Sequence, residues 1–164
     1  MSEQTKAQLV AYLKNAHALE QMSLQMTQAA AKAANDPQLR ELFQHHHDET
    51  QDHERLIRQR IEAHGETPSA ARDIAARVAA MGKGLAAMIP KDTPGRLARD
   101  GYVQEQTEIA SYELLSRVAE RAGDAETAEV ARRILQNERE TADKIAGTWD
   151  RAAELSLGAA SSSA

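Results

Sequence analysis

The sequence contains no cysteine, and its aromatic residues are limited to one Phe, one Trp and three Tyr. Without cysteine, the chain cannot form disulfides, thiolate zinc sites, iron–sulfur clusters or thiol nucleophiles. Only four prolines interrupt the 164 residues, and strand-forming residues are scarce, so we expect helix over most of the length. A chain of this length fits one domain with a sizeable hydrophobic core.

Charge and hydropathy exclude several further classes of protein. The net charge of −5 is small and the basic residues are scattered, so neither nucleic acid nor an anionic membrane surface is expected as a partner. The sequence lacks the run of about 18 apolar residues that a membrane span needs. Its first residues, MSEQTKAQ, do not have the basic and then apolar pattern of a signal peptide. We therefore expect a soluble cytoplasmic protein.

Helix-starting and helix-stopping residues divide the chain into four long helices. Asp36 is suited to cap the second helix, with Pro37 at its first position, and Gly65 can end that helix in the left-handed conformation. Thr93 and Asp124 are the corresponding starts of the third and fourth helices. The four expected helices are Gln4–Ala34, Pro37–His64, Pro94 to Gly123, and Asp124–Leu155.

The connections between these helices predict the topology. The first two helices are joined tightly, as are the last two, so each pair should form an antiparallel hairpin. About 28 residues separate the hairpins, enough for a crossover along a bundle. A short helix over Ala70–Met81 and a break at Gly82–Gly84 are expected within this crossover. The connectivity is that of an all-α, ferritin-like four-helix bundle over residues 1–157, followed by a disordered tail at 158–164.

Each long helix has an apolar stripe that glutamate interrupts near its middle. Several buried carboxylates repel one another unless cations neutralise them, and two divalent metal ions held by facing helices would do so. The glutamates also repeat between the hairpins, since 49 − 20 = 29 and 138 − 108 = 30 residues separate the members of each pair. The carboxylates that this pattern indicates as metal ligands are Glu20, Glu49, Glu105, Glu108 and Glu138.

Histidines of the second helix are further candidate ligands. His46 precedes Glu49 by one turn and His53 follows it by one turn, so either ring could bind a metal ion. The alternative for each is an imidazole at the edge of the core, hydrogen-bonded to a neighbour. Tyr102 or Tyr112 could donate a hydrogen bond to a ligand carboxylate. The remaining histidines are expected on the surface: His17, His45, His47 and His64.

Three segments resemble the YciE/YciF family of ferritin-like bacterial stress-associated proteins. They are Asn15–Gln21, His46–Thr50 and Gly101–Leu115, the last followed by Ala119–Asp124. The resemblance extends from about Leu9 to Trp149. More distantly, the layout is similar to the di-iron domain of rubrerythrins. The resemblance implies the same five carboxylate ligands, although Asp52 and Thr141 stand where rubrerythrins have histidine.

The leading functional hypothesis is therefore a dinuclear iron or manganese protein that acts on O2 or peroxide. Glu49 and Glu138 would bridge the two ions, and Glu20 with Glu105 or Glu108 would be terminal ligands. The reductant would be external, because the chain has no cysteine for a rubredoxin-like module. The alternatives are a non-catalytic protein that sequesters iron and a metal-free interaction protein whose inward glutamates pair with arginine. A homodimer paired along an exposed helix face is expected in each case.

Overall fold

A computed structural model describes residues 1–68 and 94–161, with the backbone alone for residues 159–161. Five helices and no strand lie within these ranges. They are α1 (Glu3–Ala33), α2 (Pro37–Ala63), α4 (Pro94–Ala122), α5 (Ala125–Ala146) and α6 (Trp149–Ser161). The expected short helix over Ala70–Met81, the break at Gly82–Gly84 and the Thr93 cap lie outside the described residues.

The predicted start of α2 and the predicted ends of α2 and α4 are confirmed by their hydrogen bonds. The Asp36 carboxylate accepts from the backbone N–H groups of Gln38 and Leu39, each at 3.1 Å, and so caps α2. Gly65 and Gly123 have φ values of 76° and 77°, the left-handed conformation that favours glycine. Each lets the chain close the paired hydrogen bonds that satisfy the last carbonyls of α2 and α4.

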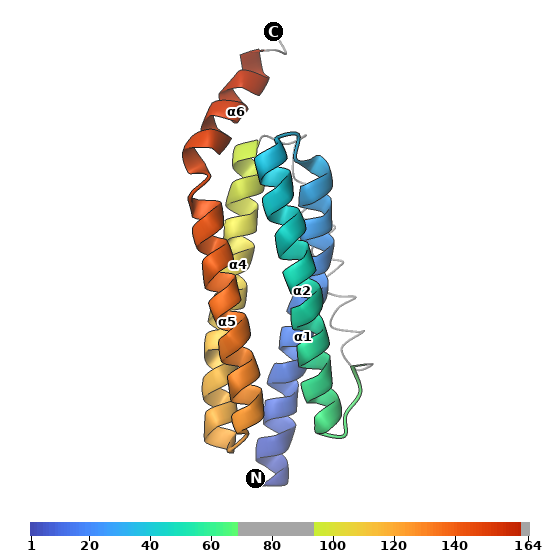
Figure 1. Ribbon diagram of the computed structural model, residues 1–164. Helices are drawn as coiled ribbons and strands as arrows, with labels where there is room; N and C mark the ends of the chain where they lie inside the picture. Colours follow the sequence, from blue (N-terminus) through green and yellow to red (C-terminus); the bar gives the residue numbers. More distant parts are fainter. Residues whose placement is uncertain (69–93, 162–164) are drawn as a thin grey trace.

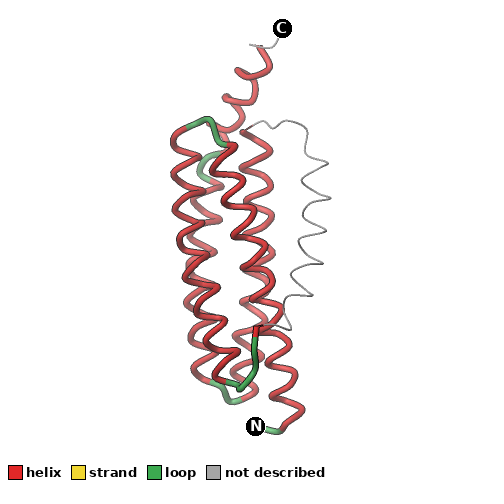
Figure 2. Tube along the Cα trace, turned by 90° about the vertical axis from the view of Figure 1, so that its right-hand side faces the viewer, coloured by secondary structure: helices red, strands yellow, loops and turns green. Residues whose placement is uncertain are grey.

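The four long helices form a bundle of two antiparallel hairpins (Figure 1). α1 pairs with α2 and α4 with α5, while α1 also packs against α4 and α2 against α5. α2 ends at the bottom of Figure 1 and α4 begins at the top, so these two helices run in the same direction. Figure 2, turned by 90°, shows the same side-by-side helices. This is the predicted ferritin-like connectivity.

The bundle interior is built in three layers along its length. One apolar cluster includes Leu9, Ile57, Leu115 and Ile134, near one end of the helices. A second, near the other end, surrounds Phe43. Between the two clusters each helix contributes buried polar side chains instead. The layer between the clusters is where the sequence places its inward glutamates.

Gly101 allows the second apolar cluster to close around the Phe43 ring. A Cβ atom at this position would lie 2.9 Å from Phe43 Cε1 and 3.4 Å from Ile145 Cδ1. Real Cβ atoms do not approach a ring carbon so closely. The absence of a side chain at Gly101 therefore leaves room for the Phe43 ring beside α4.

The fourth helix differs from its predicted course. A single helix was expected to run to Leu155, but α5 ends at Ala146 and α6 begins at Trp149. The Thr148 hydroxyl donates to the Ile145 carbonyl at 2.7 Å, and the Thr148 backbone N–H donates to the same carbonyl at 2.9 Å. These tighter local bonds replace the continuing helical ladder and bend the chain.

The predicted disordered tail is also wrong for residues 158–161, which belong to α6. Two contacts hold this helix against the end of the bundle. Arg151 is paired with the Asp36 carboxylate, and the Gly95 N–H donates to Ser156 Oγ at 2.9 Å. Ala152 is buried as well. Residues 162–164 lie outside the described residues.

Among the helices that the structure describes, none combines the length and apolar character needed to cross a bilayer.

Candidate metal centre

Four glutamates from three helices meet in the polar layer of the bundle. α1 carries Glu20, α4 carries Glu105 and Glu108 one turn apart, and α5 carries Glu138. All four residues are at most 1% exposed. Burial of several carboxylates is strongly unfavourable without compensating positive charge. α2 contributes His46 and His53, both buried, to the same layer.

These six side chains fall into two groups, each with the geometry of a metal site. In the first group, His46, Glu105, Glu108 and Glu138 each offer a ligand atom within 4.8 Å of the others. In the second group, the same is true of Glu20, His53 and Glu138. Glu138 belongs to both groups, so its carboxylate could bridge two neighbouring ions. The structure thus brings together six of the seven side chains that the sequence analysis named as candidate ligands.

In each group a histidine nitrogen lies close to a glutamate oxygen. His46 Nε2 lies 3.0 Å from Glu105 Oε1, and His53 Nδ1 lies 2.9 Å from Glu138 Oε1. Each nitrogen thus lies within ion-pair distance of a carboxylate oxygen, although the angles are not those of a hydrogen bond. Adjacent ligands at ~2.1 Å from an octahedral ion are ~3.0 Å apart. The spacing is that of two ligands of one ion, and equally that of a direct ion pair.

Unsatisfied buried oxygens point to the same conclusion. Buried polar atoms are nearly always hydrogen-bonded in folded proteins, so a cluster of exceptions needs an explanation. Among the described residues, the following site atoms have no hydrogen-bond partner: Glu20 Oε2, Glu105 Oε2, Glu108 Oε1 and both Glu138 oxygens. Carboxylate oxygens and imidazole nitrogens are donors that iron and manganese accept. The donor atoms of each group could therefore hold a metal ion.

Burial and neighbouring charges shift the pKa values of the carboxyl and imidazole groups in this site. Burial raises the pKa of Glu20 and Glu108 well above the ordinary value, and the nearby Glu138 carboxylate raises both further. Burial also raises the pKa of Glu105 to about 7, against the opposing attraction of His46. For His46, burial would lower the pKa, but the Glu105 and Glu49 carboxylates outweigh it and raise the pKa to about 10.

Glu138 is the carboxylate of this set that stays ionised. Burial would raise its pKa, but His53 beside it and the charge of His46 outweigh burial and lower the value. The carboxylate shared by the two groups is therefore negatively charged before any cation binds. This charge favours the approach of a cation to the shared position.

Hydroxyl groups around the site orient its carboxylates. The buried Tyr112 hydroxyl donates to Glu20 Oε1, as the sequence suggested for one of two tyrosines. Ser23 Oγ donates to Glu108 Oε2 at 3.4 Å. Hydrogen bonds of this kind fix the direction in which a ligand presents its free oxygen. Ser23 was not predicted, although its position one turn after Glu20 on the same face is a usable signal.

Glu49 lies at the edge of the site and in neither group. Its side chain is 21% exposed, and Oε2 is 3.1 Å from His45 Nδ1 and 3.9 Å from His46 Nδ1. Thr141 Oγ1 donates to the same oxygen at 3.4 Å. The pKa of Glu49 is lowered to about 2, because these imidazoles outweigh its partial burial. A bridging role for Glu49 stays a prediction.

Three of the four histidines expected on the surface are instead partly or fully buried. His17 is 1% exposed and its Nε2 lies 2.8 Å from Glu54 Oε1. His64 Nε2 lies 2.8 Å from Asp124 Oδ2, and His47 Nδ1 lies 3.0 Å from the Thr27 hydroxyl. In each case the partner comes from another helix or its cap, which the local pattern does not reveal. His45 is exposed as expected.

A comparison with protein families shows to which family the chain belongs. Residues 4–157 match the family described as a domain of unknown function, DUF892. The chain belongs to the DUF892 family. The match spans all five described helices except the first residue of α1 and the last residues of α6.

Two solved structures share the fold of this DUF892 member. A protein of Xanthomonas campestris pv. campestris is 25% identical, with a TM-score of 0.78 over 96% of this chain and 99% of that one. The stress protein YciF of E. coli is 18% identical, with a TM-score of 0.73 over 93% of this chain and 99% of that one. The resemblance to the YciE/YciF family that the sequence indicated is confirmed. At 18% identity, the likeness to YciF shows the fold alone.

Proposed function

We propose that this protein holds two adjacent iron or manganese ions and uses them to oxidise Fe(II) or to consume peroxide or O2. The observation that carries the proposal is the position of Glu138. This buried, ionised carboxylate belongs to two groups of ligand atoms, and both its oxygens lack a hydrogen-bond partner among the described residues. Such an arrangement is suited to a carboxylate that bridges two ions.

Each ion would have its own set of ligands. His46, Glu105 and Glu108 would hold one ion, and Glu20 and His53 would hold the other, with Glu138 common to both. Bound iron or manganese would supply reversible single-electron oxidation steps at this position. The remaining steps depend on the side chains of the protein.

The protein excludes water and keeps the ligands oriented. Apolar clusters above and below the site close the bundle interior around it. Tyr112 is fully buried, and burial raises its pKa well above 10, so its hydroxyl stays protonated and continues to donate to Glu20. Protons held by Glu20 and Glu108 in the metal-free protein would leave when cations bind.

A role in stress protection follows from the description of a related protein. The related E. coli protein is described as a stress protein, and consumption of oxidants by a di-metal centre would suit such a role. Repeated consumption of peroxide or O2 would need electrons from an external reductant. A chain without cysteine has no rubredoxin-like module to supply them.

The metal-free alternative required arginine partners for the inward glutamates. Among the described residues, no salt bridge joins Glu20, Glu105, Glu108 or Glu138 to arginine or lysine. The arginines pair with acidic residues at the surface or at helix ends instead. This observation favours a cation as the compensating charge.

Anaerobic reconstitution tests the proposal directly. The purified protein is loaded with Fe(II), its bound iron is measured by elemental analysis, and air or peroxide is added while the near-ultraviolet spectrum is recorded. We expect about two ions per chain and a ferric absorbance that develops faster than in a protein-free control. Manganese loading with a peroxide-consumption assay tests the second metal. Absence of both stoichiometric binding and turnover with either metal would refute the proposal.

A further inference from the structure

Glu49 lies between the buried centre and the molecular surface. The candidate ligands from α1, α4 and α5 are at most 1% exposed, whereas the Glu49 side chain is 21% exposed. Thr141 Oγ1 of α5 donates to Glu49 Oε2 at 3.4 Å, so the Glu49 carboxylate lies at the seam where α2 packs against α5 (Figure 1). At this seam, solvent therefore meets a carboxylate that adjoins the centre.

Four side chains offer metal-binding atoms in a series from solvent to the centre. In order of decreasing exposure they are His45 at 61%, Glu49 at 21%, His46 at 2% and Glu105 at 1%. Glu49 Oε2 lies 3.1 Å from His45 Nδ1 and 3.9 Å from His46 Nδ1. On the inner side, His46 Nε2 lies 3.0 Å from Glu105 Oε1. An ion with ligands at ~2.1 Å can contact two atoms up to ~4 Å apart, so an ion can keep a protein ligand at each step.

We propose that divalent cations enter the centre through the α2–α5 seam, captured first by His45 and Glu49 and then passed to His46. This inference rests on the proposed function, under which the ions are Fe(II) or Mn(II). Imidazole nitrogens and carboxylate oxygens are ligands that both ions accept. In the described part of the chain, the ion-pair partners of Glu49 are both histidines, which can bind the ion themselves.

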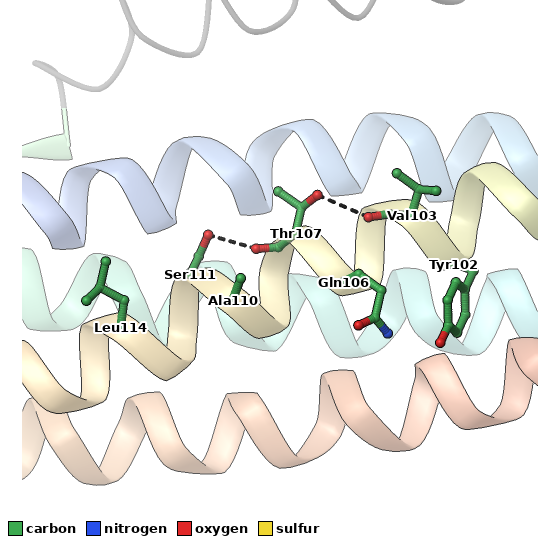
Figure 3. A pocket seen from close by; sticks show the side chains of 7 residues that line it. All are labelled: Tyr102, Val103, Gln106, Thr107, Ala110, Ser111 and Leu114. Carbon is green, nitrogen blue, oxygen red and sulfur yellow. Dashed lines mark hydrogen bonds between the residues drawn. The ribbon is translucent and has the colours of Figure 1, made fainter.

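Other faces of the bundle are less suited to admit a cation. The apolar clusters close the interior on both sides of the centre along the bundle axis. Figure 3 shows a shallow hollow on the outward face of α4, but none of its lining residues carries a carboxylate or an imidazole. The hydroxyl groups of Thr107 and Ser111 in this hollow donate to carbonyls of α4 itself. The hollow therefore offers a cation no charged ligand.

Positive charge and existing ion pairs disfavour two further approaches. A second hollow, between α1 and α2, is lined by Lys32 and Arg40, which repel cations. The remaining approach would pass His53, whose side chain is 5% exposed. The exposed carboxylate next to it in sequence, Asp52, is already paired with Arg55 at 2.8 Å. The α2–α5 seam is therefore the approach that combines exposure with available ligands.

Lys144 on α5 is a positive charge that opposes capture at this seam. It is exposed, and its charge helps to lower the pKa of Glu49, so it acts on the same carboxylate that an entering ion would bind. An ammonium group near Glu49 repels a divalent ion. Removal of Lys144 should therefore change the rate of entry in the direction opposite to removal of His45.

Rapid mixing of the metal-free protein with Co(II) tests the route. Co(II) accepts the same ligands, its visible absorbance reports uptake, and transfer to EDTA reports release. A group on the path that is not a final ligand changes both rates by the same factor and leaves the bound content at equilibrium unchanged. We expect His45→Ala to slow both rates about 10-fold, the lower range for loss of a group that supports a metal site. Lys144→Gln should speed both about twofold at low salt.

Two matched controls should leave both rates unchanged. Lys32→Gln removes the same charge as Lys144→Gln, but from the α1–α2 hollow. Gln44→Ala removes an exposed polar side chain next to His45, one that donates to Asp48 at 3.4 Å. Faster uptake by Lys32→Gln would place the entrance at the α1–α2 hollow and overturn the proposal.

The same measurements separate the route from the proposed function. Two bound ions, with rates that neither His45→Ala nor Lys144→Gln changes, would overturn the route and leave the proposed function standing. Faster release from His45→Ala would identify His45 as a ligand of the final site and would also overturn the route. A wild type that binds no Co(II), Fe(II) or Mn(II) would overturn both.

Discussion

Glu138 is the residue on which the two halves of the candidate centre depend, because its carboxylate alone belongs to both ligand groups. Glu138→Gln should abolish binding of both ions, since a neutral amide neither bridges nor balances two cations. Glu20→Gln should remove one ion and leave the other, because Glu20 belongs to one group only. Elemental analysis of reconstituted variants gives about two, one and no ions for the wild type, Glu20→Gln and Glu138→Gln.

Glu140 is the matched control for this series. It is exposed on the same helix and accepts a hydrogen bond from Gln136 at 2.9 Å. Glu140→Gln should therefore bind two ions. Equal metal content in Glu138→Gln and Glu140→Gln would show that Glu138 is not a ligand. Glu49→Gln, measured alongside, would determine whether the carboxylate at the edge of the site binds a metal.

Tyr112 supports the site through its hydrogen bond to Glu20. Tyr112→Phe removes the donor and leaves a buried carboxylate oxygen unsatisfied, so the unfolding free energy of the metal-free protein should fall by about 1–3 kcal/mol. Urea unfolding at neutral pH measures the change. Tyr102→Phe is the control, because the Tyr102 hydroxyl has no hydrogen-bond partner within the described ranges. Equal stability of the two variants would contradict this role of Tyr112.

The burial of a residue could be predicted where the sequence pattern of its own helix indicates it. The inward glutamates interrupt apolar stripes of their own helices, so their burial could be read from periodicity. His17 shows the limit of this approach. It lies on the same face as Leu13 and Glu20, which favours burial, but its partner Glu54 is on α2. Only the packing of α1 against α2 brings the two together.

At the scale of an element, Asp124 caps the start of α5. Its carboxylate accepts from the Thr127 backbone N–H at 3.0 Å and from Arg60 Nη2 at 3.3 Å, and it lies 2.8 Å from His64 Nε2. Asp124→Ala should lower the unfolding free energy by about 1–2 kcal/mol, the upper range for loss of a cap. Asp143→Ala, an exposed change on the same helix, should alter it by less than about 0.5 kcal/mol.

The contribution of Asp124 to the unfolding free energy should also depend on pH. Although partial burial acts to raise its pKa, hydrogen bonds from Thr127 and His64 and the charge of Arg60 lower the pKa of Asp124 to about 2. A carboxyl with a lowered pKa stabilises the folded state above its unfolded pKa, near 4, and loses this effect as pH falls toward 2. The stability difference between wild type and Asp124→Ala should therefore narrow between pH 5 and pH 3. A constant difference would show that charge does not contribute.

Helix ends could be predicted where the capping residue itself favours the conformation or the hydrogen bonds of a helix end. Asp36 with Pro37, and Gly65 with its positive φ, mark ends that local chemistry alone determines. The break after α5 is different. Gly147 has φ −65° and ψ −8°, a helical conformation that any residue adopts, so it gives no sequence signal of an end. α6 instead depends on contacts with Asp36 and Gly95, which are distant in the sequence.

At the scale of the whole molecule, the bundle contains a polar layer that only a positive charge makes favourable. Its place between two apolar clusters was implied by the matched spacing of glutamates in the two hairpins. The assignment of ligands to two groups was not, because it depends on how far each side chain reaches across the bundle. His53 rather than Glu49 completes the second group, and this choice requires coordinates.

The polar layer should make the metal-free protein less stable as pH rises. Glu20 and Glu108 have raised pKa values, so ionising them above about pH 4.5 favours the unfolded state. His46, with a pKa of about 10, stabilises the folded state fully below about pH 6.5 and progressively less above it. Both effects have the same sign, and the unfolding temperature of the metal-free protein should fall from pH 5.5 to pH 8.5.

Bound cations should reverse this trend, because ionised carboxylates are the form that binds metal. At a free metal concentration of 100 times the dissociation constant, each ion adds about 2.7 kcal/mol to the unfolding free energy. The gap in unfolding temperature between Mn(II)-loaded and chelator-treated protein should therefore widen with pH, as measured by calorimetry at pH 5.5, 7 and 8.5. Glu108→Gln, which removes one titrating carboxylate, should weaken the pH dependence of the metal-free protein. A gap that is absent, or that stays constant with pH, would mean that metal binding does not compensate the buried carboxylates.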